Sequence, residues 1–300
     1  CAQEGMLRMN LIADQWVDYE ILDAGDGMKL ERWGDIILSR PDPQVIWQPV
    51  RPDLWRKAHA VYNRSHSGGG NWTYQRAIPK NWQIAYDNLK FHIEPMGFKH
   101  TGLFPEQAAN WEWMRNQIRE RVSKGGTVNV LNLFGYTGGA TVACAEAGAK
   151  VCHVDASKGM VQRASENVAL SGLQGREVRY IVDDAFKFVA REIKRGHHYD
   201  GIIMDPPSYG RGPNGEVWKL EDNLYSFVKD AMSLLSEQPL FFLLNSYTTG
   251  FSPIVTGNIL RMTVPKRAGR IESGDLLIPI TSMPGTYLPC GSYAALIGEA

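Results

Sequence analysis

Several features that would narrow the function at once are scarce or absent in this 300-residue chain. The four cysteines, Cys1, Cys144, Cys152 and Cys290, form no C-x-x-C pair and no metal-ligand cluster with histidine, so we expect no metal site and a reducing, cytoplasmic compartment. No apolar run approaches the roughly 18 residues that a membrane-spanning helix needs. Because the chain begins at Cys1 rather than at a methionine, a preceding targeting segment stays open.

A dinucleotide-binding fingerprint is also missing. Residues 128–134 predict a buried strand, and Gly135 and Gly138 follow it. A G-x-G-x-x-G pattern that starts at Gly135 would need glycines at the positions of Thr137 and Ala140. The turn is therefore loose, which suits a ligand that has no pyrophosphate.

Acidic residues follow each of the next three predicted strands. These strands cover 150–154, 179–182 and 201–204, and they are followed by Asp155, by Asp183 and Asp184, and by Asp205. Ligands of an open parallel sheet bind beyond the carboxyl ends of its strands. Asp155 lies one strand-helix-strand unit after the glycine turn, where a carboxylate accepts from ribose hydroxyls, and we favour Asp184 over Asp183 as acceptor for an adenine amino group. The series predicts a site for S-adenosylmethionine (SAM).

Each of these carboxylates has another interpretation when it is taken alone. An aspartate at a strand end is more often a helix cap or a turn former than a ligand contact. The ordered series, at one strand-helix period, favours the ligand site over that alternative.

The fourth strand end carries a distinct sequence, Asp205-Pro206-Pro207-Ser208-Tyr209. The two prolines stiffen the turn and leave its carbonyl groups free of backbone donors. We predict that Asp205 and the carbonyl of Pro206 orient a substrate amine or the edge of an extruded base. Tyr209 is either a stacking wall for that base or a core aromatic.

The chain divides into two regions of different pattern. Residues 1–98 hold short apolar and aromatic runs between turn-forming clusters, which is typical of a β-rich module. After a helix predicted over 105–124, strands and helices alternate as in a parallel, doubly wound α/β sheet. The last strands, at 270–280 and 290–298, suit an antiparallel closing hairpin. We expect a β-rich N-terminal domain and a larger α/β domain over 99–300.

Basic and aromatic residues concentrate in residues 54–100. Seven basic residues stand against two acidic ones, and eight aromatic residues are interleaved with them: Trp55, Tyr62, Trp72, Tyr74, Trp82, Tyr86, Phe91 and Phe98. Such a stretch can attract phosphates and stack on unpaired bases. The slightly favoured alternative is that the aromatic side chains form the core of the β-rich module.

The motifs together resemble a known enzyme family. KHTGLFPEQ at 99–107, LNLFGYTGG at 131–139, VDAS at 154–157, DDAFKF at 183–188 and DPPSYGRG at 205–212 are similar to the class I SAM-dependent methyltransferases that modify large-subunit ribosomal RNA. That group includes cytosine-C5 enzymes and a guanine-N7 relative, and the resemblance spans about residues 98–298. It implies a Rossmann-like, mostly parallel sheet, SAM as cofactor and an RNA substrate.

The resemblance also implies roles for individual residues. The expected cofactor contacts are Thr101, Phe104 and Gln107 at the methionine end, Phe134, Gly135, Thr137 and Gly138 in the glycine turn, Asp155, Ala156 and Ser157 at the ribose, Asp184 and Ala185 at the adenine, and Asp205 at the substrate edge.

One departure from the family concerns the reaction itself. A C5 enzyme needs a thiolate that adds to C6 of the base, and the related enzymes place this cysteine after the fifth strand. Here 244–247 read Leu-Asn-Ser-Tyr, and Cys290, in a turn between the last strands, is the one candidate substitute or else a packing residue. We expect direct transfer to nitrogen or oxygen, which depends mainly on alignment. A catalytically silent SAM-binding module on RNA and a small-molecule methyltransferase are the alternatives.

Overall fold

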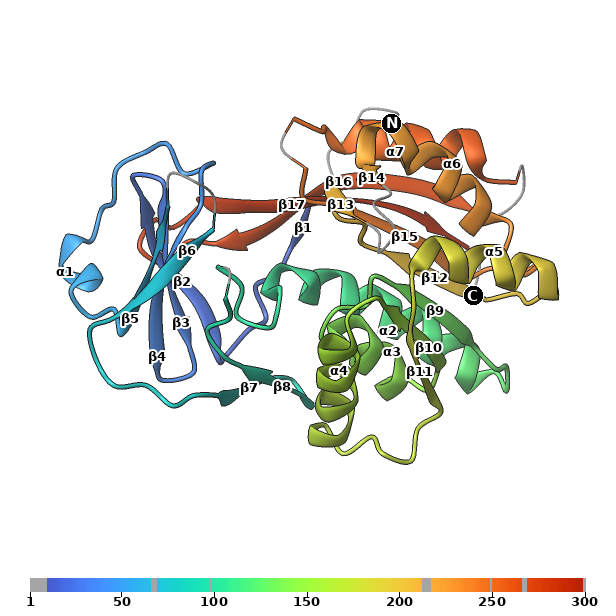
Figure 1. Ribbon diagram of the computed structural model, residues 1–300, viewed down its shortest axis with the longest axis horizontal. Helices are drawn as coiled ribbons and strands as arrows, with labels where there is room; N and C mark the ends of the chain where they lie inside the picture. The colour runs from blue at the N-terminus through green and yellow to red at the C-terminus, as the bar shows by residue number, and fades with distance from the viewer. Residues whose placement is uncertain are drawn as a thin grey trace. The chain divides into compact units, whose positions relative to one another are not determined.

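The computed structural model describes residues 10–65, 69–97, 99–211, 217–248, 250–265 and 269–298 (Figure 1). Contacts within the chain divide it into two compact units. In the described residues, the first unit takes Asn110–Leu276 with both ends of the chain, and the second takes Ile12–Ala109 and Leu277–Cys290. Among the described helices, none is long and apolar enough to cross a membrane.

An eight-stranded sheet is the frame of the first unit, in the order β1-β16-β17-β15-β12-β9-β10-β11. Its strands are β1 (Leu11–Ile12), β9 (Asn129–Leu133), β10 (Lys150–Asp155), β11 (Val178–Val182), β12 (Gly201–Met204), β15 (Phe241–Ser246), β16 (Arg270–Pro279) and β17 (Tyr287–Ile297). The five strands from β15 to β11 are parallel, and β17 runs antiparallel to β15. The expected mostly parallel sheet with antiparallel C-terminal strands is confirmed.

Helices cover both faces of this sheet (Figure 1). One face carries α2 (Ala108–Ser123), which follows the 3-10 turn η2 (Pro105–Gln107), with α3 (Gly139–Glu146) and α4 (Lys158–Leu170), and the other carries α5 (Ala185–Arg195), α6 (Leu220–Met232) and α7 (Pro253–Thr263). The helix predicted over 105–124 corresponds to η2 and α2, and the predicted alternation of strands and helices follows it, but the sequence did not predict α7. That helix contains Thr256 and Gly257, which have low helix propensity. It forms because both residues are buried within the first unit.

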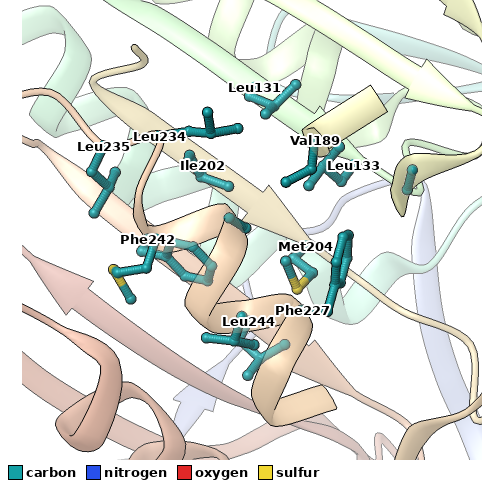
Figure 2. Packing of buried hydrophobic residues seen from close by; sticks show 14 of the residues in the cluster. Leu131, Leu133, Val189, Ile202, Met204, Phe227, Leu234, Leu235, Phe242 and Leu244 are labelled. Atoms are coloured by element: carbon teal, nitrogen blue, oxygen red, sulfur yellow. The ribbon is translucent and has the colours of Figure 1, made fainter. Parts of the chain in front are cut away.

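The core of the first unit follows from strand alternation (Figure 2). Leu131 and Leu133 of β9, Ile202 and Met204 of β12, and Phe242 and Leu244 of β15 belong to one buried cluster with side chains of α5 and α6. Since successive side chains of a strand point to opposite faces, the residues between them face α2 and α3 instead. Asn132, between Leu131 and Leu133, and Asn245, which follows Leu244, are buried polar side chains on that other face.

The second unit is rich in β structure, as predicted. It holds a five-stranded sheet of β2 (Tyr19–Gly25), β3 (Met28–Trp33), β4 (Ile36–Pro41), β5 (Ala60–Arg64) and β6 (Gly70–Tyr74), a hairpin of β7 (Trp82–Tyr86) and β8 (Leu89–Ile93), and the short helix α1 (Pro52–Trp55). The short apolar run at 45–47 forms no strand. Pro43 and Pro49 flank that segment, which instead bonds the turn at Asp26 and Gly27 through backbone groups. The functional division between 1–98 and 99–300 stays a prediction.

Most described aromatic side chains of residues 54–100 are buried or half-buried rather than exposed as stacking surfaces. Tyr62, Tyr86 and Phe91 are buried. The indoles of Trp55, Trp72 and Trp82 are half-buried, and each donates to an acceptor of the second unit. Among the described aromatic residues of this stretch, Tyr74 alone is exposed, at 55%; Phe98 lies outside the described residues. The basic residues Arg56, Lys57, Arg64, Arg76, Lys80 and Lys90 are exposed.

Candidate active site

The turn between β9 and α3 has an unusual backbone. Phe134, Tyr136 and Gly138 have φ angles of 57°, 51° and 84°. Residues other than glycine rarely adopt positive φ, and such conformations concentrate where a backbone must meet a ligand. Gly138 is also the N-cap of α3, and its carbonyl accepts the first helical bond, from the Val142 N–H at 2.8 Å.

The glycines of this turn are required by what lies beneath them. A Cβ on Gly135 would lie 2.4 Å from the imidazole of His153 on β10, and a Cβ on Gly138 would lie 2.7 Å from the Cβ of Ala164 on α4. His153 is fully buried, and its Nδ1 lies 2.8 Å from the hydroxyl of Thr141 at the start of α3. Burial lowers the pKa of His153 to about 4, so the ring is neutral near pH 7. A neutral histidine therefore forms the floor of the turn.

Asp155 at the end of β10 is tied directly to this turn. Its carboxylate accepts from the N–H of Tyr136 at 2.9 Å and from the N–H of Ser157 at 2.8 Å, one bond on each oxygen. Ser157 then caps α4 through the N–H of Met160, and the neighbouring Ala156 is exposed. An ionised carboxylate oxygen has two acceptor positions, so each oxygen of Asp155 keeps one for a ligand hydroxyl. The side chain is thus oriented and can still accept from both ribose hydroxyls.

The two aspartates after β11 differ in the hydrogen bonds and ion pairs that their carboxylates form. Asp183 pairs with Arg191 and also accepts from the N–H of Asp184. Asp184 is the N-cap of α5, since one of its oxygens accepts from the Lys187 N–H at 3.0 Å, which is the cap role weighed above. No other described residue donates to its second oxygen. This difference favours Asp184 as the adenine acceptor; Ala185, the next residue, is buried in the first turn of α5.

The Asp205-Pro206-Pro207 turn leaves β12 beside β9. Asp205 is half-buried and Pro206 is buried. The carbonyl of Pro207 accepts from the indole of Trp218 at 2.5 Å, whereas no described donor bonds the carbonyl of Pro206. Tyr209 is 51% exposed, so the core-aromatic alternative for it is wrong.

A short hairpin follows this turn. Its strands are β13 (Tyr209–Arg211) and β14 (Val217–Lys219), which pair antiparallel. Residues 212–216, which connect these two strands, lie outside the described residues.

Aromatic contacts join three of the strand ends. Phe186 comes two residues after Asp184. The centroid of its ring lies 4.1 Å from the centroid of the Phe227 ring and 4.6 Å from that of the Trp218 ring. Phe134 of the glycine turn lies 6.2 Å from Phe186. The glycine turn, the end of β11 and the proline turn therefore share one cluster, which the sequence did not predict because these rings lie far apart along the chain.

Comparison with known proteins decides the family. The sequence model of the S-adenosylmethionine-dependent methyltransferases matches residues 58–221. The crystal structure of a SAM-dependent methyltransferase from Agrobacterium tumefaciens superimposes with a TM-score of 0.91 and 35% identity, over 98% of this chain and 94% of that one. The chain belongs to the SAM-dependent methyltransferases. SAM is its cofactor.

Curated relatives of this methyltransferase include proteins named ribosomal RNA large subunit methyltransferase K/L. One from Shewanella baltica is 34% identical over 237 residues, and one from Shewanella frigidimarina is 28% identical over 240 residues. Each match covers 76% of this chain. The chain spans only about a third of the length of these relatives, 30% and 31% respectively.

The methyltransferase has no thiol where a C5 enzyme would carry one. Asn245 and Ser246 at the end of β15 are nearly enclosed, with 2% and 4% of their surfaces exposed. Burial raises the pKa of Cys144 to about 12, that of Cys152 to about 11 and that of Cys290 well above its ordinary value. Every described cysteine is therefore held as the thiol, which is a poor nucleophile.

The three residues expected at the methionine end of SAM belong to the second unit. Thr101 is buried, and its carbonyl accepts from the Glu94 N–H at 3.1 Å. Phe104 and Gln107 are half-buried and lie at the entrance to α2, where the Gln107 N–H donates to the Phe104 carbonyl. Their contact with SAM stays a prediction.

The residues present in the first unit fit SAM chemically. Asp155 offers two acceptor positions for ribose hydroxyls, and Asp184 offers one for an amino group. The glycine turn lacks the G-x-G-x-x-G spacing that is typical of pyrophosphate binding, and SAM carries no pyrophosphate. Thr137 supports the turn, because its carbonyl accepts from the buried Asn167 side chain at 2.9 Å.

Proposed function

We propose that this methyltransferase acts on RNA, with large-subunit ribosomal RNA as its substrate class, and that it transfers the methyl group directly to a nitrogen or an oxygen. The observation that carries the direct transfer is the pair of strand ends at β12 and β15. Asp205 supplies an acceptor there, and Asn245 stands where a C5 enzyme would need a thiolate.

Two further observations support RNA as the substrate. The curated relatives from Shewanella are named for ribosomal RNA methylation, and they match three quarters of this chain. The exposed basic side chains of the second unit supply phosphate attraction that does not depend on nucleotide sequence. The aromatic residues of that unit contribute little, since most of them are core.

We assign SAM binding to the glycine turn, Asp155 and Asp184. When bound, SAM supplies an electrophilic methyl group. Asp205 and the Pro206 carbonyl accept from the N–H groups of a substrate amine and orient its nitrogen, and the exposed ring of Tyr209 stacks on the base. Since alignment supplies most of the barrier reduction, these side chains need no strong acid or base among them.

The substrate class is tested with labelled SAM and separated RNA, protein and metabolite fractions of a cell extract. We expect label in ribosomal RNA that lacks the modification, and none in protein. Label in the metabolite fraction alone would show a small-molecule methyltransferase, and saturable SAM binding without any transfer would show a catalytically silent module.

The role of Asp205 is tested by Asp205→Ala. Because a small misplacement of a reacting group can cost about 100-fold in rate, we expect kcat to fall by about that factor. The affinity for S-adenosylhomocysteine, measured by calorimetry, should change much less. Asp230→Ala, an exposed aspartate on α6, is the matched control. Full activity of Asp205→Ala would refute the orienting role.

A further inference from the structure

Asn245 occupies a buried position with a defined hydrogen-bond partner. It belongs to β15 and faces α2, where its Oδ1 accepts from the Nδ2 of Asn110 at 3.1 Å. Asn110 is fully buried. The four apolar residues that precede Asn245 in β15, Phe241 to Leu244, are all fully buried, so Asn245 is a polar side chain at the end of an apolar strand.

The orientation of the Asn245 amide is settled by a third residue. Amide groups can usually be turned by 180° without a change in fit, which makes their donors and acceptors ambiguous. Here the indole of Trp113 donates to Oδ1 of Asn110 at 3.1 Å, and an indole N–H can only donate. Asn110 must therefore present its oxygen to Trp113 and its NH₂ group to Asn245. Asn245 must in turn present its oxygen to Asn110.

These hydrogen bonds do not use the Nδ2 donor of Asn245. No described residue accepts from it. Some polar atoms of the described residues are inaccessible to solvent and lack a partner, but Nδ2 of Asn245 is not one of them. Since this nitrogen has no acceptor among the described residues, it must be accessible to solvent, at the carboxyl end of β15. The parallel register of β12 and β15 pairs Met204 with Leu244. In sequence, Asp205 and Asn245 come directly after these two residues, so one acceptor and one donor lie at the carboxyl ends of neighbouring strands.

We propose that Asn245 and Asp205 form a donor–acceptor pair that selects an amino-heterocycle, meaning a ring nitrogen that accepts next to an exocyclic amine that donates. Adenine and cytosine present this edge, as does the N2/N3 edge of guanine. Uracil and a ribose hydroxyl do not. This inference rests on the proposed function and narrows it, because it names the kind of base edge that the site holds.

Asn245→Asp is the most direct test. It keeps the shape and the oxygen that Asn110 needs, but it replaces the free donor with an acceptor. We expect kcat/KM for ribosomal RNA to fall at least about ten-fold, since a ring nitrogen would then meet an acceptor. The dissociation constant of S-adenosylhomocysteine should stay within about two-fold, which a merely structural role would not ensure. Asn258→Asp, an exposed asparagine on α7, adds the same charge as a control.

Trp113→Phe tests the orienting chain separately. Without the indole donor, Asn110 is free to turn its amide and accept from Asn245, which engages the donor that the substrate needs. We expect a smaller fall in kcat/KM for RNA, of about two- to five-fold, again without loss of S-adenosylhomocysteine binding. Loss of cofactor binding in either variant, or RNA activity of Asn245→Asp within two-fold of the wild type, would overturn the proposal.

The identity of the product gives an independent readout. Mass spectrometry of nucleosides from RNA labelled by the wild type should place the methyl group on an exocyclic amine, because the adjacent ring nitrogen uses its lone pair to accept from Asn245. A methyl group on carbon, on a ribose oxygen or on uracil would overturn the pair. If the wild type labels no RNA, the proposed substrate class fails on its own. The metabolite fraction then tests the donor–acceptor pair. A labelled amino-heterocycle in that fraction would support the pair, and any other product, or none, would overturn it.

Discussion

Replacing Gly135 with alanine should destabilise the glycine turn between β9 and α3, because the new Cβ would clash with the buried ring of His153. The new Cβ would lie 2.4 Å from Cε1 and 2.5 Å from Nδ1 of His153, and ordinary contact begins near 3.4 Å, so the ring must move by about 1 Å. The ring is fully buried, and its Nδ1 is bonded to Thr141. Overpacking of this kind costs about 1–3 kcal/mol, and the lost hydrogen bond adds about 1 kcal/mol. We expect the free energy of unfolding to fall by about 2–4 kcal/mol.

A double-mutant cycle measures this coupling. Urea denaturation is compared for the wild type, Gly135→Ala, His153→Ala and the double variant. The alanine at position 135 should cost at least about 1 kcal/mol less once the imidazole is gone. Gly175→Ala is the control, because its Cβ would meet no atom within 4 Å and its φ is not positive. The same cost in both backgrounds, or a cost of Gly135→Ala below about 0.5 kcal/mol, would refute the reasoning.

Two further predictions concern the second unit. Cys290→Ser should retain methyl transfer within about two-fold, because burial raises the thiol pKa and leaves no thiolate to lose; a loss of activity with intact folding would restore Cys290 as a nucleophile. Burial alone would raise the pKa of Glu31, but Arg40 and Lys29 lower it to about 2. Because the folded pKa lies below the ordinary value of 4.5, this stabilisation is complete above about pH 4.5 and is lost as the pH falls toward 2, on the order of 3 kcal/mol. Urea midpoints measured across that range should show this loss, and Glu31→Gln should flatten it; an unchanged slope would contradict the assignment.

The parts of the fold that could be predicted are those where one local pattern dominates. Parallel strands covered on both faces are near-continuous apolar runs, so Gly201–Met204 and its neighbours were evident from the sequence. The β-rich unit was harder, because its strands alternate and are broken by buried charges such as Glu31. The helix α7 was missed since burial outweighs the low helix propensity of Gly257.

The residues of the candidate site could also be predicted only where a local pattern marks them. Asp155, Asp184 and Asp205 could be located because each follows a strand, and the ends of parallel strands meet at one edge of the sheet. Tyr136 acts through its backbone N–H, so the residue type carries no signal for it. His153 and Trp113 act through contacts with residues distant in sequence, and such contacts exist only once the helices have packed.

The second unit receives its last residues from the far end of the chain. Leu277–Cys290 belongs to it, and there Ile280 bridges to Ile21, and the Ser282 hydroxyl donates to the buried Asp23 carboxylate at 2.5 Å. On a ribosome, the N-terminal strands would emerge more than 250 residues before these partners. The β-rich unit therefore cannot complete its fold until these later residues have been made. A shortened protein that ends at Leu276 would leave Asp23 without a hydroxyl partner, so both units depend on the final strands to become complete.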